Sequence, residues 1–300
     1  MSPPRSVGGL EASFVSNGSS RLAVRQWDAG GTPILALHPG VADSRVWQEC
    51  ARVWADAGHR VVAYDRRGFG STTWEEEPHD PLCDLRAVTA ATGSRPAVVV
   101  GNSKGGALGL ELALAHPEEV LALVVIGSVP DDTPDDLWVL APTEDERDAE
   151  AAAAAASGDL DLVNRLDLRY WLDGIGQPEG RVTGVPRELL AEMNGTALRA
   201  ISTGAVTATR PVWPVLESLA VPTFLVVGEY DLPGFAVVAA AIAERVSDAQ
   251  VVILQGTAHL PPLDAPAAVA ALVLDVVAGV SMSPPHGVRD TGPDHTPALP

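Results

Sequence analysis

The stretch Gly101-Asn102-Ser103-Lys104-Gly105-Gly106 decides the fold of this chain. It matches the pattern G-x-S-x-G and stands between an apolar run, 97–100, and a segment of helical pattern, 105–115. In this setting the serine is predicted to occupy a sharp strand-to-helix turn that projects its hydroxyl from the end of a sheet. Side chains at Gly101 and Gly105 would collide with neighbouring backbone, and the helix N-terminus favours negative charge beside the serine. Ser103 is therefore a candidate nucleophile.

Apolar strands and amphipathic helices alternate on both sides of this motif. Before it, a hairpin with its turn at Asn17-Gly18 is followed by strands at 34–37 and 60–64 and helices at 46–57 and 81–92. After it come strands at 120–126, 222–227 and 251–254 and helices at 235–246 and 266–280. This pattern predicts an α/β fold with a mostly parallel central sheet and helices on both faces.

Residues 129–209 interrupt the alternation, because they carry no strand pattern and contain an alanine-rich helical stretch. We predict a helical cap over 129–209, an α/β core from 1–128 and 210–280, and a disordered tail at 281–300. The cap leaves and re-enters the core at the sheet edge where Ser103 is expected to point. Trp171, in the aromatic cluster Tyr170-Trp171-Leu172, is therefore a candidate substrate-binding residue.

Two further candidates for catalysis follow strands late in the chain. His259 comes after the strand at 251–254, at the same predicted sheet edge as Ser103, and is the candidate base. Asp231, after the strand at 222–227, is the candidate acid that orients the base. Glu229 is the near alternative for the acid, and Asp131 or Asp132 is the distant one.

These motifs together resemble those of the α/β-hydrolase superfamily, from the first hairpin to residue 280. The matching stretches are His38-Pro39-Gly40, Asp65-Arg66-Arg67-Gly68-Phe69-Gly70-Ser71, the serine motif, Gly228-Glu229-Tyr230-Asp231 and Gly256-Thr257-Ala258-His259. The resemblance implies a catalytic triad of Ser103, Asp231 and His259, in the chain order that this fold uses. The stretch 65–71 is interpreted as a structural loop near the serine turn.

The resemblance also implies an oxyanion hole built from the backbone N–H of Lys104 and an N–H of the first loop. Pro39 replaces the glycine usual in that loop and has no N–H, so the second donor is assigned to Gly40, with Val41 in reserve. Val41 is also a candidate substrate-binding residue. The Lys104 side chain is unfavourable at a helix start, so we expect it to meet a carboxylate of the protein or an acidic substrate.

The predicted function is that of a serine hydrolase acting on a small carboxylic ester or lactone through an acyl-enzyme. Carbon–carbon bond hydrolysis and perhydrolysis would use the same triad. A non-hydrolytic ligand-binding protein or a biosynthetic cyclase of the same fold is the alternative from another class. Turnover of an activated ester separates hydrolysis from tight binding without turnover.

The amino-acid composition limits the classes of partner that this protein is expected to bind. With 39 acidic and 20 basic residues the net charge is -19, which disfavours nucleic acid and anionic lipid surfaces. No apolar run is long enough to cross a bilayer and no secretory signal is evident, so a cytoplasmic protein without a membrane partner is predicted. The two cysteines provide no metal-ligand spacing, and neither metal nor cofactor is predicted. A small-molecule substrate is the expected partner, and the sequence gives no indication of oligomeric state.

Overall fold

The central sheet is described by a computed structural model that covers residues 12–141, 144–208 and 210–282. Within these ranges the sheet has eight strands in the order β1-β2-β4-β3-β5-β6-β7-β8. β1 pairs antiparallel with β2 and β2 with β4, whereas the other neighbours pair in parallel. The predicted mostly parallel sheet is thus confirmed. The strands are β1 (Ser13–Asn17), β2 (Ser20–Trp27), β3 (Ile34–Leu37), β4 (Val61–Tyr64), β5 (Ala97–Asn102), β6 (Val120–Ile126), β7 (Thr223–Gly228) and β8 (Ala249–Leu254).

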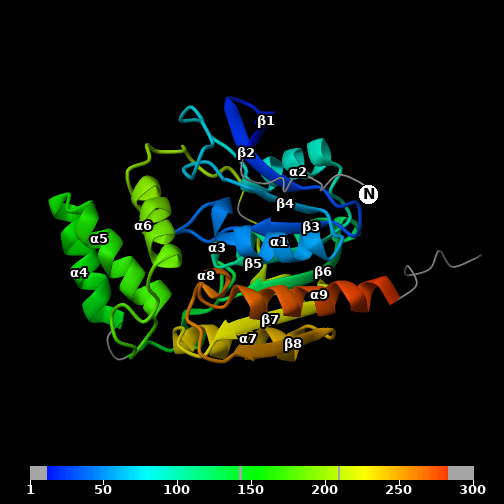
Figure 1. Ribbon diagram of the computed structural model, residues 1–300. Coiled ribbons are helices and arrows are strands. Elements are labelled where there is room, and N and C mark those ends of the chain that lie inside the picture. Colours follow the sequence, from blue (N-terminus) through cyan, green and yellow to red (C-terminus); the bar gives the residue numbers. More distant parts are fainter. Residues whose placement is uncertain (1–11, 142–143, 209, 283–300) are drawn as a thin grey trace, which may run out of the picture.

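Helices cover both faces of the sheet (Figure 1). Side chains alternate along the central strands: Ile34 and Ala36 pack in the cluster that includes α1 and α9, whereas Leu35 and Leu37 pack in the cluster that includes α2, α3 and α7. Strands buried on both faces require such continuous apolar runs. The core helices are α1 (Gln48–Asp56), α2 (Pro81–Thr92), α3 (Lys104–Ala115), α7 (Pro233–Arg245), α8 (Pro261–Asp264) and α9 (Pro266–Met282), with short helices η1 (Ser44–Trp47), η2 (Pro117–Glu119), η3 (Asp135–Leu137) and η5 (Trp213–Ser218).

Several predicted boundaries move. The helix predicted at 46–57 is divided into η1 and α1, because the Asp43 side chain accepts from the Arg45 N–H and starts a 3₁₀ turn first. β5 continues into the serine motif, since its pairing with β6 runs as far as Asn102 and Ile126. α9 extends to Met282, so the first two residues of the predicted tail are helical. The rest of that tail, and residues 1–11 of the predicted core, lie outside the described residues.

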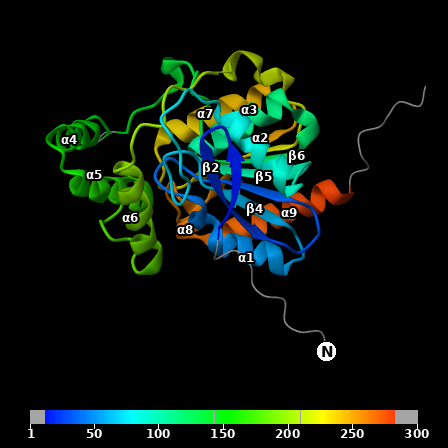
Figure 2. The same cartoon turned by 90° about the horizontal axis from the view of Figure 1, so that it is seen from above.

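The segment between β6 and β7, residues 129–209, is called the insertion. It contains helices α4 (Glu144–Ser157), α5 (Leu160–Asp167) and α6 (Val185–Leu198). Between α5 and α6 the chain forms η4 (Leu168–Asp173), a π-helix. Figures 1 and 2 both place α4, α5 and α6 together on one side of the core, with α8 between α6 and the sheet.

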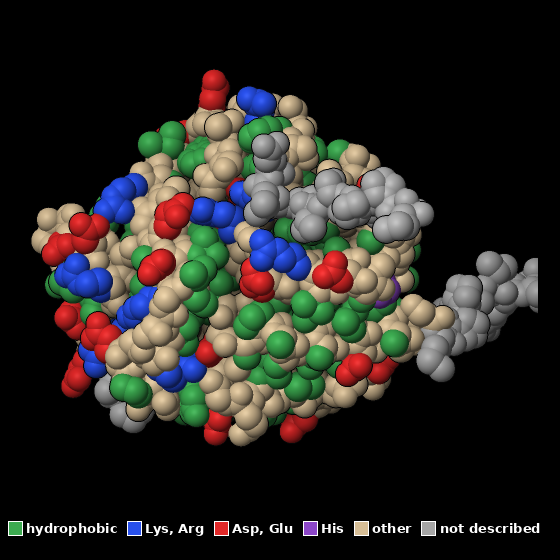
Figure 3. Space-filling model, viewed as in Figure 1, with side chains coloured by type: hydrophobic (Ala, Val, Ile, Leu, Met, Phe, Trp, Pro, Cys, Tyr) green, Lys and Arg blue, Asp and Glu red, His purple; other side chains and the backbone are tan. Residues whose placement is uncertain are grey.

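Hydrophobic side chains gather over α9 on the face seen in Figure 3. A groove of about 1140 Å³ lies between α9 and the first residues of β6 and β7, including Val120 and Phe224. Ser103 follows the last residue of β5, so this groove lies at the opposite end of the parallel strands. None of the helices in the described ranges combines the length and apolarity needed to cross a membrane.

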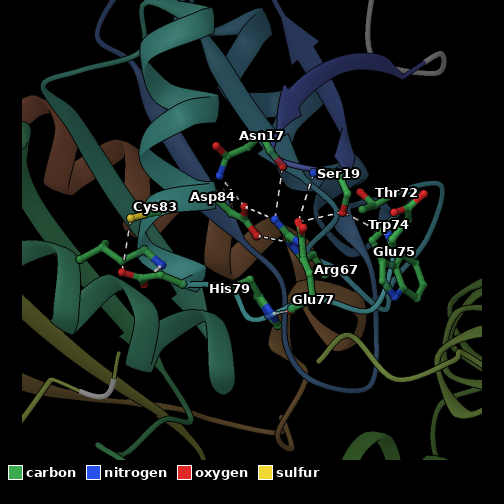
Figure 4. Close-up of polar contacts among 12 residues, drawn as sticks. Asn17, Ser19, Arg67, Thr72, Trp74, Glu75, Glu77, His79, Cys83 and Asp84 are labelled. Carbon is green, nitrogen blue, oxygen red and sulfur yellow. Dashed lines mark hydrogen bonds and ion pairs between the residues drawn. The ribbon is translucent and has the colours of Figure 1, made fainter. Parts of the chain in front are cut away.

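Arg67, from the stretch 65–71, ties the first hairpin to α2 (Figure 4). Its guanidinium contacts Asp84 at 2.8 Å and Glu77 at 2.9 Å, and it donates to the Asn17 carbonyl at 3.3 Å. The guanidinium, with the Ser19 hydroxyl, lowers the pKa of Glu77 to about 2. Arg67 and Asp84 are both buried. Each neutralises the charge of the other, and either charge buried without its partner would destabilise the fold.

We expect Arg67→Met to lower the free energy of unfolding by about 3–5 kcal/mol, because Asp84 would keep a buried charge without its partner. Urea denaturation followed by circular dichroism measures the change. Arg60→Met is the matched control, because its pair with Asp28 is exposed and such pairs contribute about 0–1 kcal/mol. Equal losses in the two variants would contradict the assignment.

Candidate active site

Ser103 occupies a strained turn between β5 and α3. Its φ of 53° and ψ of -122° make it the only non-glycine residue with a positive φ in the ranges that the structure describes. Such a conformation costs about 1–3 kcal/mol and persists only where the surroundings impose it. Here the Ser103 N–H donates to the Ile126 carbonyl at 2.8 Å, while its own carbonyl accepts from the Gly106 N–H at 2.8 Å. The turn therefore fixes the serine at the C-terminal edge of the sheet.

The glycines of the motif allow β5 and α3 to approach each other. A Cβ on Gly101 would lie 2.3 Å from the Gly105 carbonyl oxygen, and one on Gly105 would lie 2.2 Å from the Leu37 carbonyl oxygen. Neither contact is tolerable, and in both cases the obstacle is backbone that cannot rotate away. The expectation that these two positions require glycine is thus explained by the geometry.

His259 and Asp231 form a buried pair. The His259 Nδ1 lies 2.9 Å from Asp231 Oδ2 and 3.1 Å from Oδ1. The two side chains are 3% and 2% exposed, which excludes water from the hydrogen bond. Asp231 Oδ1 also accepts from the Leu232 N–H at 2.8 Å, so the carboxylate is fixed by its own loop. With Nδ1–H bonded to the carboxylate, Nε2 is left as the proton acceptor.

Three neighbours that the sequence reasoning missed or left open enclose this pair. Phe235 and Trp171 contact the imidazole, with ring centroids 4.8 Å and 4.5 Å from that of His259. Gly127, after β6, has a φ of 50°, and a Cβ there would lie 2.9 Å from Asp231 Oδ2 and 3.0 Å from His259 Nδ1. Apolar rings and a bare backbone thus leave the imidazole little freedom to turn.

Asn102 links the serine turn to the histidine loop. Its side-chain amide donates to the Ile126 carbonyl at 3.0 Å and to the His259 carbonyl at 3.0 Å. Asn102 is fully buried, and its neighbour in sequence is Ser103. The structure therefore holds the His259 backbone against the residue that precedes Ser103, although the two lie far apart in the chain. No local signal in the sequence indicates this role, because the position before the serine is variable in the G-x-S-x-G pattern.

The loop from His38 to Val41, called here the His38 loop, lies beside the serine turn: a Cβ on Gly40 would be 3.5 Å from Lys104 Cγ. His38 is fully buried and accepts from the Arg66 N–H at Nε2, 3.0 Å away, so its Nδ1–H donates to the Pro39 carbonyl at 2.8 Å. Burial, with the Arg66 charge, holds the pKa of His38 well below its usual range. Arg66 Nη2 also donates to the His38 and Pro39 carbonyls, both at 3.1 Å. The loop is therefore held by a neutral histidine and a guanidinium.

The alternative acids have other partners. Asp131 pairs with the Lys104 ammonium at 2.7 Å, which satisfies the expectation that Lys104 meets a carboxylate. Asp132 accepts from the Val212 and Trp213 N–H groups, both at 3.0 Å, and Glu229 accepts from the Gly256 N–H at 2.8 Å. Among the four candidates, Asp231 is the one that the structure places against His259.

Side chains that could bind a metal lie elsewhere. Among the described residues, one group of side chains has possible ligand atoms within 4.8 Å of one another. It consists of His116, Glu118 and Glu119. They stand between α3 and β6, at the start of β6, whereas Ser103 lies at the far end of the parallel strands. The site around Ser103 instead contains a hydroxyl, an imidazole–carboxylate pair and backbone N–H groups, which are the components of acyl transfer.

Comparison with known proteins gives consistent matches. A family model described as alpha/beta hydrolase fold matches residues 32–266. The chain is 30% identical over 203 residues to 2-hydroxymuconate semialdehyde hydrolase from Pseudomonas sp. (strain CF600), covering 54% of this chain and 70% of that protein. It is 32% identical over 104 residues to a non-heme chloroperoxidase of Streptomyces lividans, covering 33% of this chain and 38% of that protein. Other curated relatives are matched over 26% to 42% of their own length.

Solved structures match the fold over most of the chain. A hydrolase from Pseudomonas aeruginosa PA01 superposes with a TM-score of 0.69 at 26% identity, covering 89% of this chain and 98% of that one. An esterase from Exiguobacterium antarcticum has a TM-score of 0.72 at 18% identity, covering 89% of this chain and 99% of that one, which shows likeness of fold. Together with the family match over residues 32–266, these findings show that the chain belongs to the α/β-hydrolase family.

Proposed function

We propose that this protein is a serine hydrolase that cleaves a small carboxylic ester or lactone through an acyl-enzyme intermediate. The observation that carries the proposal is the strained Ser103 turn, joined through Asn102 to the loop of the buried His259–Asp231 pair. A strained serine is typical of a nucleophile turn, and a histidine whose tautomer is fixed by a carboxylate is typical of its base. Family membership supports the reaction class, and the substrate is part of the proposal.

The mechanism follows from the polar atoms of the site. His259 Nε2 takes the Ser103 proton as the hydroxyl oxygen attacks the carbonyl carbon, and Asp231 stabilises the imidazolium that forms. The N–H groups of Lys104 and Gly40 donate to the oxygen that gains negative charge, with Val41 as the alternative donor in the His38 loop. The imidazolium then protonates the leaving alcohol, and water, activated by the same base, releases the acid.

A second candidate is perhydrolysis, in which hydrogen peroxide replaces water in the second step and the acyl group leaves as a peracid. The matches to a non-heme chloroperoxidase and to a non-heme haloperoxidase of Rhodococcus erythropolis favour testing it. Both reactions share the first step, so peracid formation in the presence of peroxide separates them. A small-molecule substrate is proposed in either case.

The insertion is proposed to act as a cap that selects the substrate. Its π-helix η4 carries Trp171 to within contact of His259, with 4.5 Å between ring centroids. Trp171 is only partly buried, which supports a contact with an apolar substrate group. π-helical turns often occur at functional sites, which supports this role for η4. Val41 is proposed to contact the substrate from the His38 loop.

Ser103→Ala should reduce kcat for a 4-nitrophenyl ester by about 10⁴- to 10⁶-fold, because no other group can form the acyl-enzyme. A fluorophosphonate probe should modify Ser103, as located by mass spectrometry of the digested protein. Ser218→Ala is the control and should keep wild-type activity, since Ser218 is exposed and only donates to the Val215 carbonyl. Modification of another residue in active enzyme would refute the nucleophile assignment.

Asp231→Asn should reduce kcat by about 10⁴-fold, because the amide favours the tautomer in which Nε2 carries the proton. Glu229→Gln should stay within about 3-fold of wild type, since Glu229 only accepts from the Gly256 N–H at the surface. Steady-state kinetics on one ester measures both variants. Full activity in Asp231→Asn together with a large loss in Asp131→Asn would show that the acid is Asp131.

Trp171→Ala should change the ratio of kcat/KM between short and long acyl esters by about 10-fold, the scale of one or two methylene contacts. Kinetics over a series of 4-nitrophenyl esters measures this ratio, which a general loss of activity leaves unchanged. Trp74→Ala is the control, because Trp74 donates to the Ser202 carbonyl and does not contact His259. A uniform loss that follows the melting temperature would leave Trp171 with a packing role only.

A further inference from the structure

Arg181 of the insertion links the end of η4 to the loop that carries His259, the proposed base. On one side, its Nε donates to the Asp173 carbonyl at 2.6 Å and its Nη2 to the Leu172 carbonyl at 2.7 Å. On the other side, Nη1 donates to the Gly256 carbonyl at 3.0 Å, and the guanidinium forms a two-bond ion pair with Asp264. The first two carbonyls end η4, whereas Gly256 belongs to the loop of His259.

Asp264 extends this bridge to the residue before the base. Its Oδ2 accepts from the Ala258 N–H at 2.9 Å, so the carboxylate fixes the backbone from which the imidazole projects. The Arg181 and Asp264 side chains are 17% and 7% exposed, so the pair is shielded from solvent. A bidentate guanidinium–carboxylate pair in such surroundings has a well-defined geometry.

The same stretch of the insertion packs directly on the loops of Asp231 and His259. The Ile175 N–H donates to the Tyr230 carbonyl at 2.8 Å. A Cβ on Gly174 would lie 2.7 Å from Tyr230 Cβ and 2.9 Å from Ala258 Cβ, so no side chain fits there. The Arg181 guanidinium lies 5.3 Å from the centre of the Tyr230 ring. These contacts leave η4 one position relative to the base.

We propose that Arg181 is a positioning residue for the reaction: it holds η4, and with it Trp171, at a fixed distance from His259. This inference rests on the proposed function, in which His259 is the base. The insertion then has a second task besides selecting substrate, because Trp171 of η4 packs against the imidazole. A misplacement of about 1 Å at a reacting group costs on the order of 10²-fold in rate.

Arg181→Met should therefore lower kcat by about 10- to 100-fold, with KM changed less than kcat. A second readout needs no turnover: the proton on His259 Nδ1, bonded to Asp231, should give a far-downfield NMR resonance that disappears in His259→Gln. In Arg181→Met that resonance should broaden, because a base released from Trp171 exchanges its proton with water sooner. If no ester is turned over by the wild type, the proposed function fails, and the resonance still tests the role of Arg181.

Two further variants separate positioning from folding. Arg199→Met is the control within the insertion, since Arg199 bonds only Asp161 and the Gly195 carbonyl, and it should keep both kcat and the resonance. Arg181→Met combined with Asp264→Asn removes the unpaired buried charge, which restores stability while the bonds to η4 stay absent. We expect this double variant to fold and to remain impaired. Wild-type kcat in the double variant, or an unbroadened resonance in Arg181→Met, would overturn the proposal.

Discussion

The close approach of α3 to β5 is the constraint on which the remaining geometry depends. With no Cβ at Gly101 or Gly105, the helix can begin one residue after Ser103 and lie against the Leu37 carbonyl at the end of β3. This proximity forces Ser103 into a conformation that L-amino acids avoid. It also sets Lys104 beside the His38 loop, so one packing contact positions both the proposed nucleophile and the residue whose N–H is a proposed oxyanion donor.

The parallel sheet delivers the other groups to this turn. β5, β6, β7 and β8 are neighbours with a common direction, so the segments that follow them emerge at one edge. Ser103, Gly127, Asp231 and His259 are each found in such a segment. The insertion leaves the core after β6, at this same edge, and the chain rejoins the core before β7. That arrangement explains how η4, remote in sequence from His259, packs against its ring.

The strands and the candidate triad could be predicted because each leaves a local trace in the sequence. Buried parallel strands such as β6 are unbroken apolar runs, and the serine turn needs glycines at fixed positions. The supporting contacts leave no such trace. Asn102 and His259 are 157 residues apart, and Arg181 and Asp264 are 83 apart, so nothing in either neighbourhood identifies the partner. The choice between Asp231 and Asp131 was open for the same reason, since both carboxylates follow strands.

The neutral state of His38 makes acid a specific stress on its loop. Above pH about 6.5 the ring carries no extra proton in either the folded or the unfolded chain, and its contribution to stability is complete. As the pH falls further, the unfolded chain takes up a proton that the folded chain resists, because the pKa of His38 is lowered in the fold. The fold then loses up to about 1.4 kcal/mol per pH unit from this one group. A protonated ring would also lose its capacity to accept from the Arg66 N–H and would place two cations side by side. Lowering the pH would thus stress the His38 loop through a ring that lies outside the proposed triad.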